Sequence, residues 1–168
     1  MFQISRRVDY AIRIMVELGL HQIARDYLPA REISRQTDVP KAFLHKITAD
    51  LVRAGLVRTY SGPKGGLALA RPTDQINMLH ILEAIDGPVL LNTCLLRPRE
   101  CPRDLVCAGH GFWGRMQAMV IAELQAGTLE KLVAESQALR KNPPKQRADI
   151  PYLFPNDANH DGGADEQT

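Results

Sequence analysis

Three cysteines lie close together in the chain, and their spacing limits the chemistry they could perform. Cys94, Cys101 and Cys107 form a C-x6-C-x5-C pattern. Structural zinc sites use closer pairs such as C-x2-C, and ferredoxin clusters use equally tight runs. Wide spacing in an irregular, proline-broken segment is typical of a loop that wraps a cluster, and nearby cations favour the thiolate form. The basic residues of this segment are Arg97, Arg99 and Arg103.

Three thiolates leave one ligand position to another kind of residue. His110 follows Cys107 by three residues, and Asp9 lies beside the apolar face of the first predicted helix. A non-thiolate ligand exchanges more readily, as a sensor requires. Simpler roles stay open, with His110 as a loop or helix-cap residue and Asp9 as an ion-pair partner of Arg13. The cysteines themselves could be unlinked buried thiols.

Basic residues in the first half of the chain accompany a helix-turn-helix pattern. A helix expected after Pro40, at 41–54, would present its N-terminal residues to base edges in the major groove. These residues are Lys41, Ala42, His45 and Lys46. Arg31 and Arg35 precede the turn and could contact phosphates. A solvated basic face or a protein-interaction module are the alternatives, because a fold does not fix a function.

A glycine-rich turn joins two β-prone segments at 56–61 and 67–70 and predicts a hairpin, or wing. The turn reads Gly62-Pro63-Lys64-Gly65-Gly66. Arg58, Lys64 and the open N–H groups of Gly65 and Gly66 are its candidate DNA contacts. The turn does not lie between a strand and a helix, so it is not a nucleotide-binding loop. No nucleophile–base pair or pair of carboxylates stands out, and an enzyme is not expected.

Helical periodicity predicts the elements that position these residues: helices at 5–20, 30–36, 41–54 and 76–85, an irregular loop at 88–109, and a helix at 112–124 that resumes after Gly127. The inward faces of two helices are expected to hold Val8, Ala11, Ile12, Met15, Val16 and Gly19, and Phe43, Leu44, Ile47, Leu51 and Val52. The predicted fold class is mainly α with a small β-hairpin wing, a winged helix-turn-helix followed by a long helix.

Composition bounds the protein class. The chain has 168 residues, 45% hydrophobic and 24% charged, as in ordinary globular proteins, and carries no apolar run long enough to span a membrane. Without a leader segment it is expected in the cytoplasm, where an odd number of cysteines does not form a disulfide framework. Residues 1–75 hold 12 Lys/Arg against 7 Asp/Glu, whereas residues 142–168 hold 2 against 5. That asymmetry indicates nucleic acid as partner of the first half and a disordered acidic tail.

From Ile4 to about Val133 the chain resembles the bacterial iron–sulfur winged-helix regulators that include IscR, NsrR and RirA. The residues that carry the resemblance are Val8-Asp9-Tyr10-Ala11-Ile12-Arg13, the wing from Gly62 to Ala70, Ile81-Leu82-Glu83-Ala84-Ile85-Asp86-Gly87, the three cysteines, Phe112-Trp113 and Thr128-Leu129. The wing together with three cysteines at this separation is a specific combination.

The resemblance implies a homodimeric transcription factor that binds a palindromic operator, with a cluster whose state sets DNA affinity and a long dimerisation helix that crosses its partner. Cys94, Cys101 and Cys107 match the family's ligands. His110 matches the fourth ligand of 2Fe–2S members, and Asp9 the one that a partner subunit supplies in 4Fe–4S members, so the cluster type stays open.

Other matches concern DNA. His45 and Lys46 match base-reading positions. Ser61 stands where the family's wing often carries an arginine, which leaves Arg58 and Lys64 as substitutes. The first cysteine gap is one residue longer than in IscR-like members.

We therefore predict a DNA-binding domain at 1–75, a linker helix, cysteine loop and dimerisation helix at 76–137, and a disordered acidic tail at 138–168. The predicted function is regulation of transcription in response to nitric oxide, redox state or iron. A metal-free thiol regulator on the same fold and a winged-helix adaptor are the alternatives.

Overall fold

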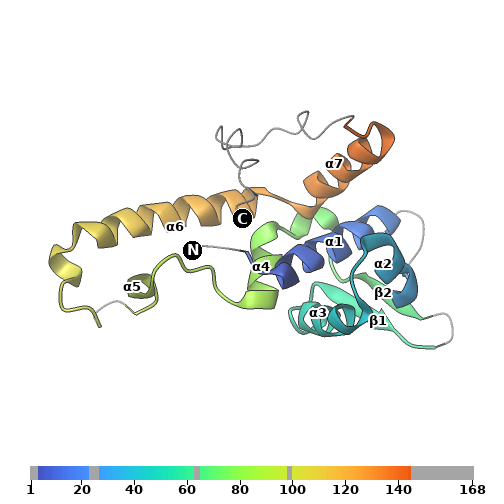
Figure 1. The fold of residues 1–168 in the computed structure, drawn as a ribbon, viewed down its shortest axis with the longest axis horizontal. Coiled ribbons are helices and arrows are strands. Elements are labelled where there is room, and N and C mark those ends of the chain that lie inside the picture. The colour runs from blue at the N-terminus through green and yellow to red at the C-terminus, as the bar shows by residue number, and fades with distance from the viewer. Residues whose placement is uncertain (1–3, 23–26, 63–64, 98–99, 145–168) are drawn as a thin grey trace, which may run out of the picture.

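The computed structural model describes residues 4–22, 27–62, 65–97 and 100–144 of the chain (Figure 1). Its helices are α1 (Arg6–His21), α2 (Ala30–Thr37), α3 (Lys41–Arg53), α4 (Met78–Asp86), α5 (Thr93–Leu96), α6 (Ala108–Ala126) and α7 (Leu129–Lys141). The strands β1 (Val57–Tyr60) and β2 (Gly66–Leu69) pair antiparallel, from Val57 opposite Leu69 to Tyr60 opposite Gly66. Single 3-10 turns lie at Thr73–Gln75 and Asp104–Val106. The predicted mainly α fold with a small hairpin is confirmed.

Local sequence signals explain where the helices near the wing begin and end. Ser5 caps α1, and its hydroxyl accepts a hydrogen bond from the Val8 N–H, as predicted. Asp38 ends α2 in the left-handed conformation at φ 55°, and the Ser34 hydroxyl donates to the Val39 carbonyl at 2.8 Å. Pro40 then stands as the N-cap residue of α3, just before the helix rather than inside its first turn. The α2–α3 turn is thereby held tightly.

The hydrophobic core lies where α1, α2, α3, α4 and the hairpin meet, and α7 closes it from one side. Fully buried members include Ile14, Met15, Ile33, Leu44, Ile47, Leu51, Ile76, Ile81 and Leu129. Two predicted inward residues of α3 differ from expectation, because Phe43 is 41% and Val52 37% exposed. The buried stripe of α3 runs through Leu44, Ile47 and Leu51, and Phe43 instead packs edge-on against the Tyr10 ring. On α1, Ile14 and Leu18 are buried in addition to the predicted residues, and Ile12 and Val16 are half-buried and pack against the core.

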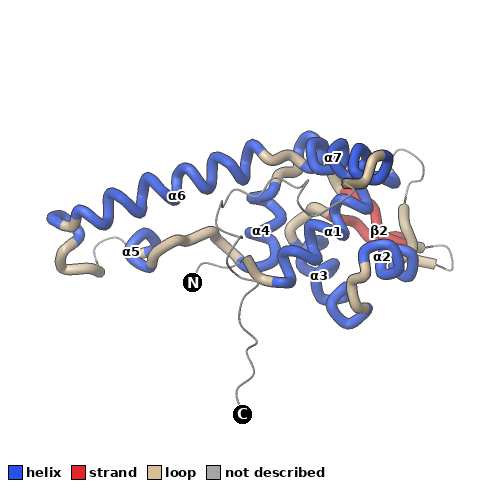
Figure 2. The backbone as a smooth tube through the Cα atoms, turned by 45° about the horizontal axis from the view of Figure 1, so that its top comes forward, coloured by secondary structure: helices blue, strands red, loops and turns tan. Residues whose placement is uncertain are grey.

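The helix α6 and the segment before it form an arm that projects from this core, as Figures 1 and 2 show. α6 begins at Ala108, four residues earlier than predicted, and the predicted irregular loop contains α5 and a 3-10 turn. No residue of α6 is buried in the single chain. The Leu91 N–H donates to the Gln117 side-chain oxygen at 3.2 Å and holds the loop against α6.

The chain segments before α4 and after α6 are hydrogen-bonded to each other. The Met78 N–H donates to the Gly127 carbonyl at 2.9 Å, and the Leu129 N–H donates to the Ile76 carbonyl at 2.7 Å. These bonds form an isolated antiparallel bridge between Asn77 and Thr128. The chain therefore returns from the arm to the point where α4 began.

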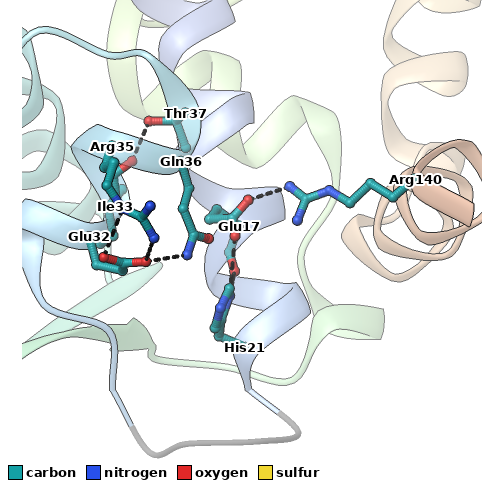
Figure 3. A network of polar contacts seen from close by, with 8 residues as sticks. All are labelled: Glu17, His21, Glu32, Ile33, Arg35, Gln36, Thr37 and Arg140. Carbon is teal, nitrogen blue, oxygen red and sulfur yellow. Dashed lines mark hydrogen bonds and ion pairs between the residues drawn. The ribbon is translucent and has the colours of Figure 1, made fainter. Parts of the chain in front are cut away.

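A buried carboxylate on α1 anchors α7. Glu17 is 2% exposed, and its Oε2 lies 2.5 Å from an Arg140 guanidinium nitrogen (Figure 3). Its Oε1 lies 3.2 Å from Nδ1 of His21. Because α1 also carries Gly19, where a side chain would lie 2.5 Å from a Val133 methyl, the two helices approach closely at this level. The ion pair thus secures a tightly packed junction.

Replacing Arg140 with alanine is expected to lower the free energy of unfolding by about 1.5–3 kcal/mol, because it leaves the Glu17 charge buried without its guanidinium partner. The loss is smaller than for a fully buried pair since the Arg140 side chain is 53% exposed. Chemical denaturation measures it. Lys141→Ala, in the same last turn of α7, is the control and should change stability by less than about 0.5 kcal/mol. Equal stability of the two variants would contradict this role of Arg140.

Candidate nucleic-acid interface and cysteine loop

The N-terminal half of α3 presents its predicted DNA-reading residues to solvent. Lys41, Ala42, His45 and Lys46 are all exposed, while the neighbouring Leu44 and Ile47 are buried. Inward packing of the apolar stripe therefore fixes the outward direction of the other side chains. A helix held in this way suits insertion into a major groove.

On α2, Arg31 and Arg35 are both exposed, but Arg35 is already engaged. Its Nε and Nη2 donate to the two carboxylate oxygens of Glu32 at 3.2 and 2.5 Å, and Gln36 donates to the same carboxylate at 2.6 Å (Figure 3). The hydrogen bond from Arg35, followed by the one from Gln36, lowers the pKa of Glu32 to about 2, and the same pairing raises the pKa of Arg35. Arg35 must exchange this partner to reach a phosphate.

The wing carries an ordered arginine. Arg58 and Tyr60 are exposed and lie two residues apart on β1, on the same face of the hairpin. The Arg58 guanidinium lies 5.9 Å from the centroid of the Tyr60 ring, which in turn packs 5.6 Å from the Tyr27 ring. Cation–π attraction holds such a side chain in one direction. Ser61 is exposed beside it, and Lys64 lies outside the described residues.

The backbone of the wing turn differs from expectation at Gly65. Its N–H donates to the Gly62 carbonyl at 2.9 Å and is therefore not open to a phosphate. A side chain at Gly65 would lie 2.2 Å from the Tyr60 carbonyl oxygen, and Gly62 adopts φ 109°. Gly65 is required because only glycine fits this closely packed turn.

A charged cleft that sequence reasoning missed lies between α1 and α3. Arg7 Nη2 lies 2.5 Å from Asp50 Oδ2, and Arg53 Nη1 lies 2.8 Å from Asp50 Oδ1. The open cleft has a volume of about 550 Å³ and is also lined by Phe43 and Lys46. The spacing of Asp50 and Arg53 on one helix was a visible signal. Arg7 gave none, because it is 43 residues from Asp50.

The three thiols all lie in the arm. Cys94 is in α5 and Cys101 follows it in a bend, both half-buried, whereas Cys107 is exposed and precedes the first residue of α6. The His110 N–H donates to the Cys107 carbonyl at 3.1 Å, so these two residues share the first turn of α6. None of the three forms a disulfide within the described residues. Three sulfurs and an imidazole in one segment are a donor set that iron–sulfur centres use.

The donors are near one another in sequence but not gathered into a coordination site. Among the residues that the structure describes, no three His, Cys, Asp or Glu side chains are arranged to hold a metal ion. The donor types therefore fit a cluster, and the segment must close to bind one. Arg97 is paired with Glu100 at 3.4 Å, and Arg103 is exposed. Arg99 lies outside the described residues.

Asp9 lies apart from the thiols of its own chain. It is on α1 in the core, whereas α5 and the start of α6 lie at the far end of the arm (Figure 1). Its carboxylate is 2.8 Å from the Arg13 guanidinium, and both side chains are about half exposed. The ion pair considered from the sequence is thus present, and Asp9 could reach a cluster only on a second copy of the chain.

No helix in the described parts of the chain has the length and apolar character needed to cross a bilayer.

Known proteins resemble this chain over most of its length. The model of the Rrf2 family, described as an iron-dependent transcriptional regulator, matches residues 4–135. A protein of Aquifex aeolicus that is named as an HTH-type transcriptional regulator is 30% identical over 132 residues, which cover 77% of this chain and 90% of that one. IscR of Photorhabdus laumondii is 27% identical over 150 residues, covering 87% and 90%. The solved structure of CymR, the global cysteine regulator of B. subtilis, matches with a TM-score of 0.68 at 27% identity and covers 80% of this chain and 98% of that one.

Proposed function

Because this chain belongs to the Rrf2 family of DNA-binding transcriptional regulators, we propose that it acts as a homodimer whose affinity for a palindromic operator is set by an iron–sulfur cluster in the arm. Membership of that family confirms that the chain is a regulator and not an enzyme, and it leaves no reason to retain an adaptor without DNA. The observation that carries the sensing proposal is that all three thiols lie in the same projecting arm, which also contains the solvent-exposed α6.

Each part of the chain has a separate task in this proposal. We assign DNA reading to residues 1–75, through α3, α2 and the wing, and the cluster and the dimer contact to residues 76–137. The tail predicted at 138–168 begins too early, because α7 runs to Lys141 and its Arg140 is paired with Glu17. Because α6 runs from the cysteine loop back to the core, a change of order in the loop tilts one subunit against the other. A dimer must match half-sites about one helical turn apart, so a small rotation changes operator affinity.

The ligands proposed for the cluster are Cys94, Cys101 and Cys107, with His110 or Asp9 of the partner subunit in the fourth position. His110 supports a 2Fe–2S centre through its place one turn after Cys107. Asp9 supports a 4Fe–4S centre through its exposure on α1, where a second subunit can reach it. When bound, the cluster supplies sensitivity to nitric oxide, oxidants and iron supply. The reducing cytoplasm is the compartment in which thiolates stay available for it.

A metal-free thiol sensor is the second candidate, and the exposure of Cys107 favours it. An exposed thiol is accessible to oxidants, as a redox-sensing cysteine must be. Absorption in the sulfur-to-iron charge-transfer region after anaerobic reconstitution separates the two candidates.

Operator binding tests the proposed function. A palindromic duplex is first selected from a random pool with anaerobically reconstituted protein, and its Kd is then measured with and without the cluster. We expect the two Kd values to differ by about tenfold or more, the range of ordinary allosteric coupling.

Lys46→Ala should bind the selected duplex about tenfold more weakly, because the alanine side chain no longer reaches a base. Lys141→Ala on α7 should bind as wild type does. Equal Kd values with and without the cluster would refute the sensing role and leave DNA binding standing.

A further inference from the structure

The cleft between α1 and α3, which we call the Asp50 cleft, consists of Arg7, Phe43, Lys46, Asp50 and Arg53, with Ala49 in its lining. It opens on the same exposed side of α3 that carries Lys46. Three cationic side chains face one carboxylate there, so the cleft is positively charged. Such a site attracts an anion.

Asp50 holds two arginines that come from different helices. Its side chain is 17% exposed, and each of its oxygens contacts one guanidinium nitrogen, Oδ2 that of Arg7 and Oδ1 that of Arg53. A guanidinium has five N–H donors in a rigid plane, so most donors of both arginines are left over. The carboxylate therefore fixes the direction of the two groups without consuming them.

We propose that Asp50 is a positioning residue for DNA binding, which orients Arg7 and Arg53 so that the cleft receives a backbone phosphate next to the site read by α3. This rests on the proposed operator binding. Planar guanidinium groups match phosphate oxygens in pairs, and Arg is favoured over Lys where that geometry matters. Phosphate contacts fix the register of a protein on its duplex. The Asp50 cleft thus sets how α3 enters the groove.

The pair formed by Glu32 and Arg35 offers a natural comparison. It is also a carboxylate–arginine pair near the DNA-reading surface, but both groups lie on α2, three residues apart. Glu32 takes two nitrogens of the same guanidinium, and its further partner Gln36 is on α2 as well. Glu32 consequently withholds an arginine from DNA, whereas Asp50 aims two arginines at it.

The two carboxylates lead to opposite expectations. Charge alone predicts that removing either one strengthens binding to the polyanion. Positioning predicts that Asp50→Asn weakens binding even though a negative charge is removed. Glu32→Gln, which releases Arg35, is the matched control and should strengthen binding.

In the experiment, full-length protein is titrated into a labelled mixed-sequence duplex, and the fluorescence anisotropy of the duplex is measured at several salt concentrations. The duplex is long enough for both subunits of a dimer to contact it. Asp50→Asn is expected to raise Kd about fivefold. The slope of log K against log salt concentration should become less steep by about 1 for each phosphate that the protein no longer binds. Arg7→Ala and Arg53→Ala should show the same flattening. In a variant that already carries both Arg7→Ala and Arg53→Ala, Asp50→Asn should weaken binding no further, because Asp50 acts through those two arginines. Glu32→Gln should lower Kd about threefold.

Tighter binding by Asp50→Asn, equal to that of Glu32→Gln, would overturn the positioning role while leaving DNA binding intact. If wild type bound no duplex at low salt, the proposed function itself would fall. Melting temperatures show which variants fold. Should Asp50→Asn not fold, unchanged salt slopes in folded Arg7→Ala and Arg53→Ala would overturn the proposal equally, because the phosphate is bound by those two arginines.

Discussion

Cys107→Ser protein, reconstituted anaerobically with iron and sulfide, is expected to retain less than about a tenth of the iron and sulfide of wild type and to lack its colour. The proposed cluster has three thiolate ligands, and a serine hydroxyl stays protonated and binds iron far more weakly than a thiolate. Cys107 is the exposed thiol at the start of α6, so its replacement disturbs no packing. Iron and sulfide analysis with absorption spectra measures the loss.

Leu105→Ala is the control, because Leu105 lies in the same segment and is fully exposed, at 101%. It should bind iron as wild type does. His110→Ala and Asp9→Ala then identify the fourth ligand, since only removal of the true ligand should change the spectrum or the iron-to-sulfide ratio. Wild-type protein that stayed colourless and free of iron would rule out the cluster and leave the thiol sensor.

Met119→Glu is expected to dissociate the proposed homodimer, raising its dissociation constant at least about a hundredfold, or roughly 2.7 kcal/mol. Phe112, Met116 and Met119 recur at helical spacing on α6 and are exposed by 49%, 36% and 67% in the single chain. Exposed apolar side chains in such a stripe mark a protein contact. A carboxylate placed in the middle of that contact would have to be buried without a partner.

Sedimentation equilibrium on the cluster-free protein measures this change apart from iron binding. Gln125→Glu adds the same charge to the same exposed helix about a third of a turn away from the Met119 direction, and it should remain dimeric. A Met119→Glu variant that sediments as wild type does would show that the stripe on α6 is not the dimer contact.

How far the sequence anticipated the structure depends on whether a feature is local. The capped start of α1 at Ser5, the turn before Pro40 and the hairpin around Gly62 follow from neighbouring residues, and these predictions are confirmed. The start of α6 was placed too late because Gly109 and Gly111 have low helix propensity and hide its first turn. Helical spacing also could not tell which of two adjacent apolar residues on α3 faces inward, and Phe43 was assigned wrongly.

In the candidate site, too, local features were predicted from the sequence and contacts between distant residues were not. Residue types alone indicated the thiols and the basic face of α3, and the structure leaves their roles as predictions. Ion pairs seen only in the structure change how the arginines near the DNA-reading surface are interpreted. Arg35 is tied to Glu32, at a spacing visible in the sequence, whereas Arg7 meets Asp50 across 43 residues and could be found only in three dimensions. The Gly65 N–H was assigned to DNA because the sequence does not show that the turn itself uses it.

The bridge between Asn77 and Thr128, together with the core helix α4, closes the base of the arm, so that the segment from residue 87 through α6 is a side branch of the molecule. A branch that leaves and rejoins its trunk at one point can be lengthened, melted or replaced with little effect on the stability of the trunk, since loop-closure entropy grows only slowly with length. The proposed function requires this separation, because the cysteine segment is to change its order while the DNA-binding domain stays folded.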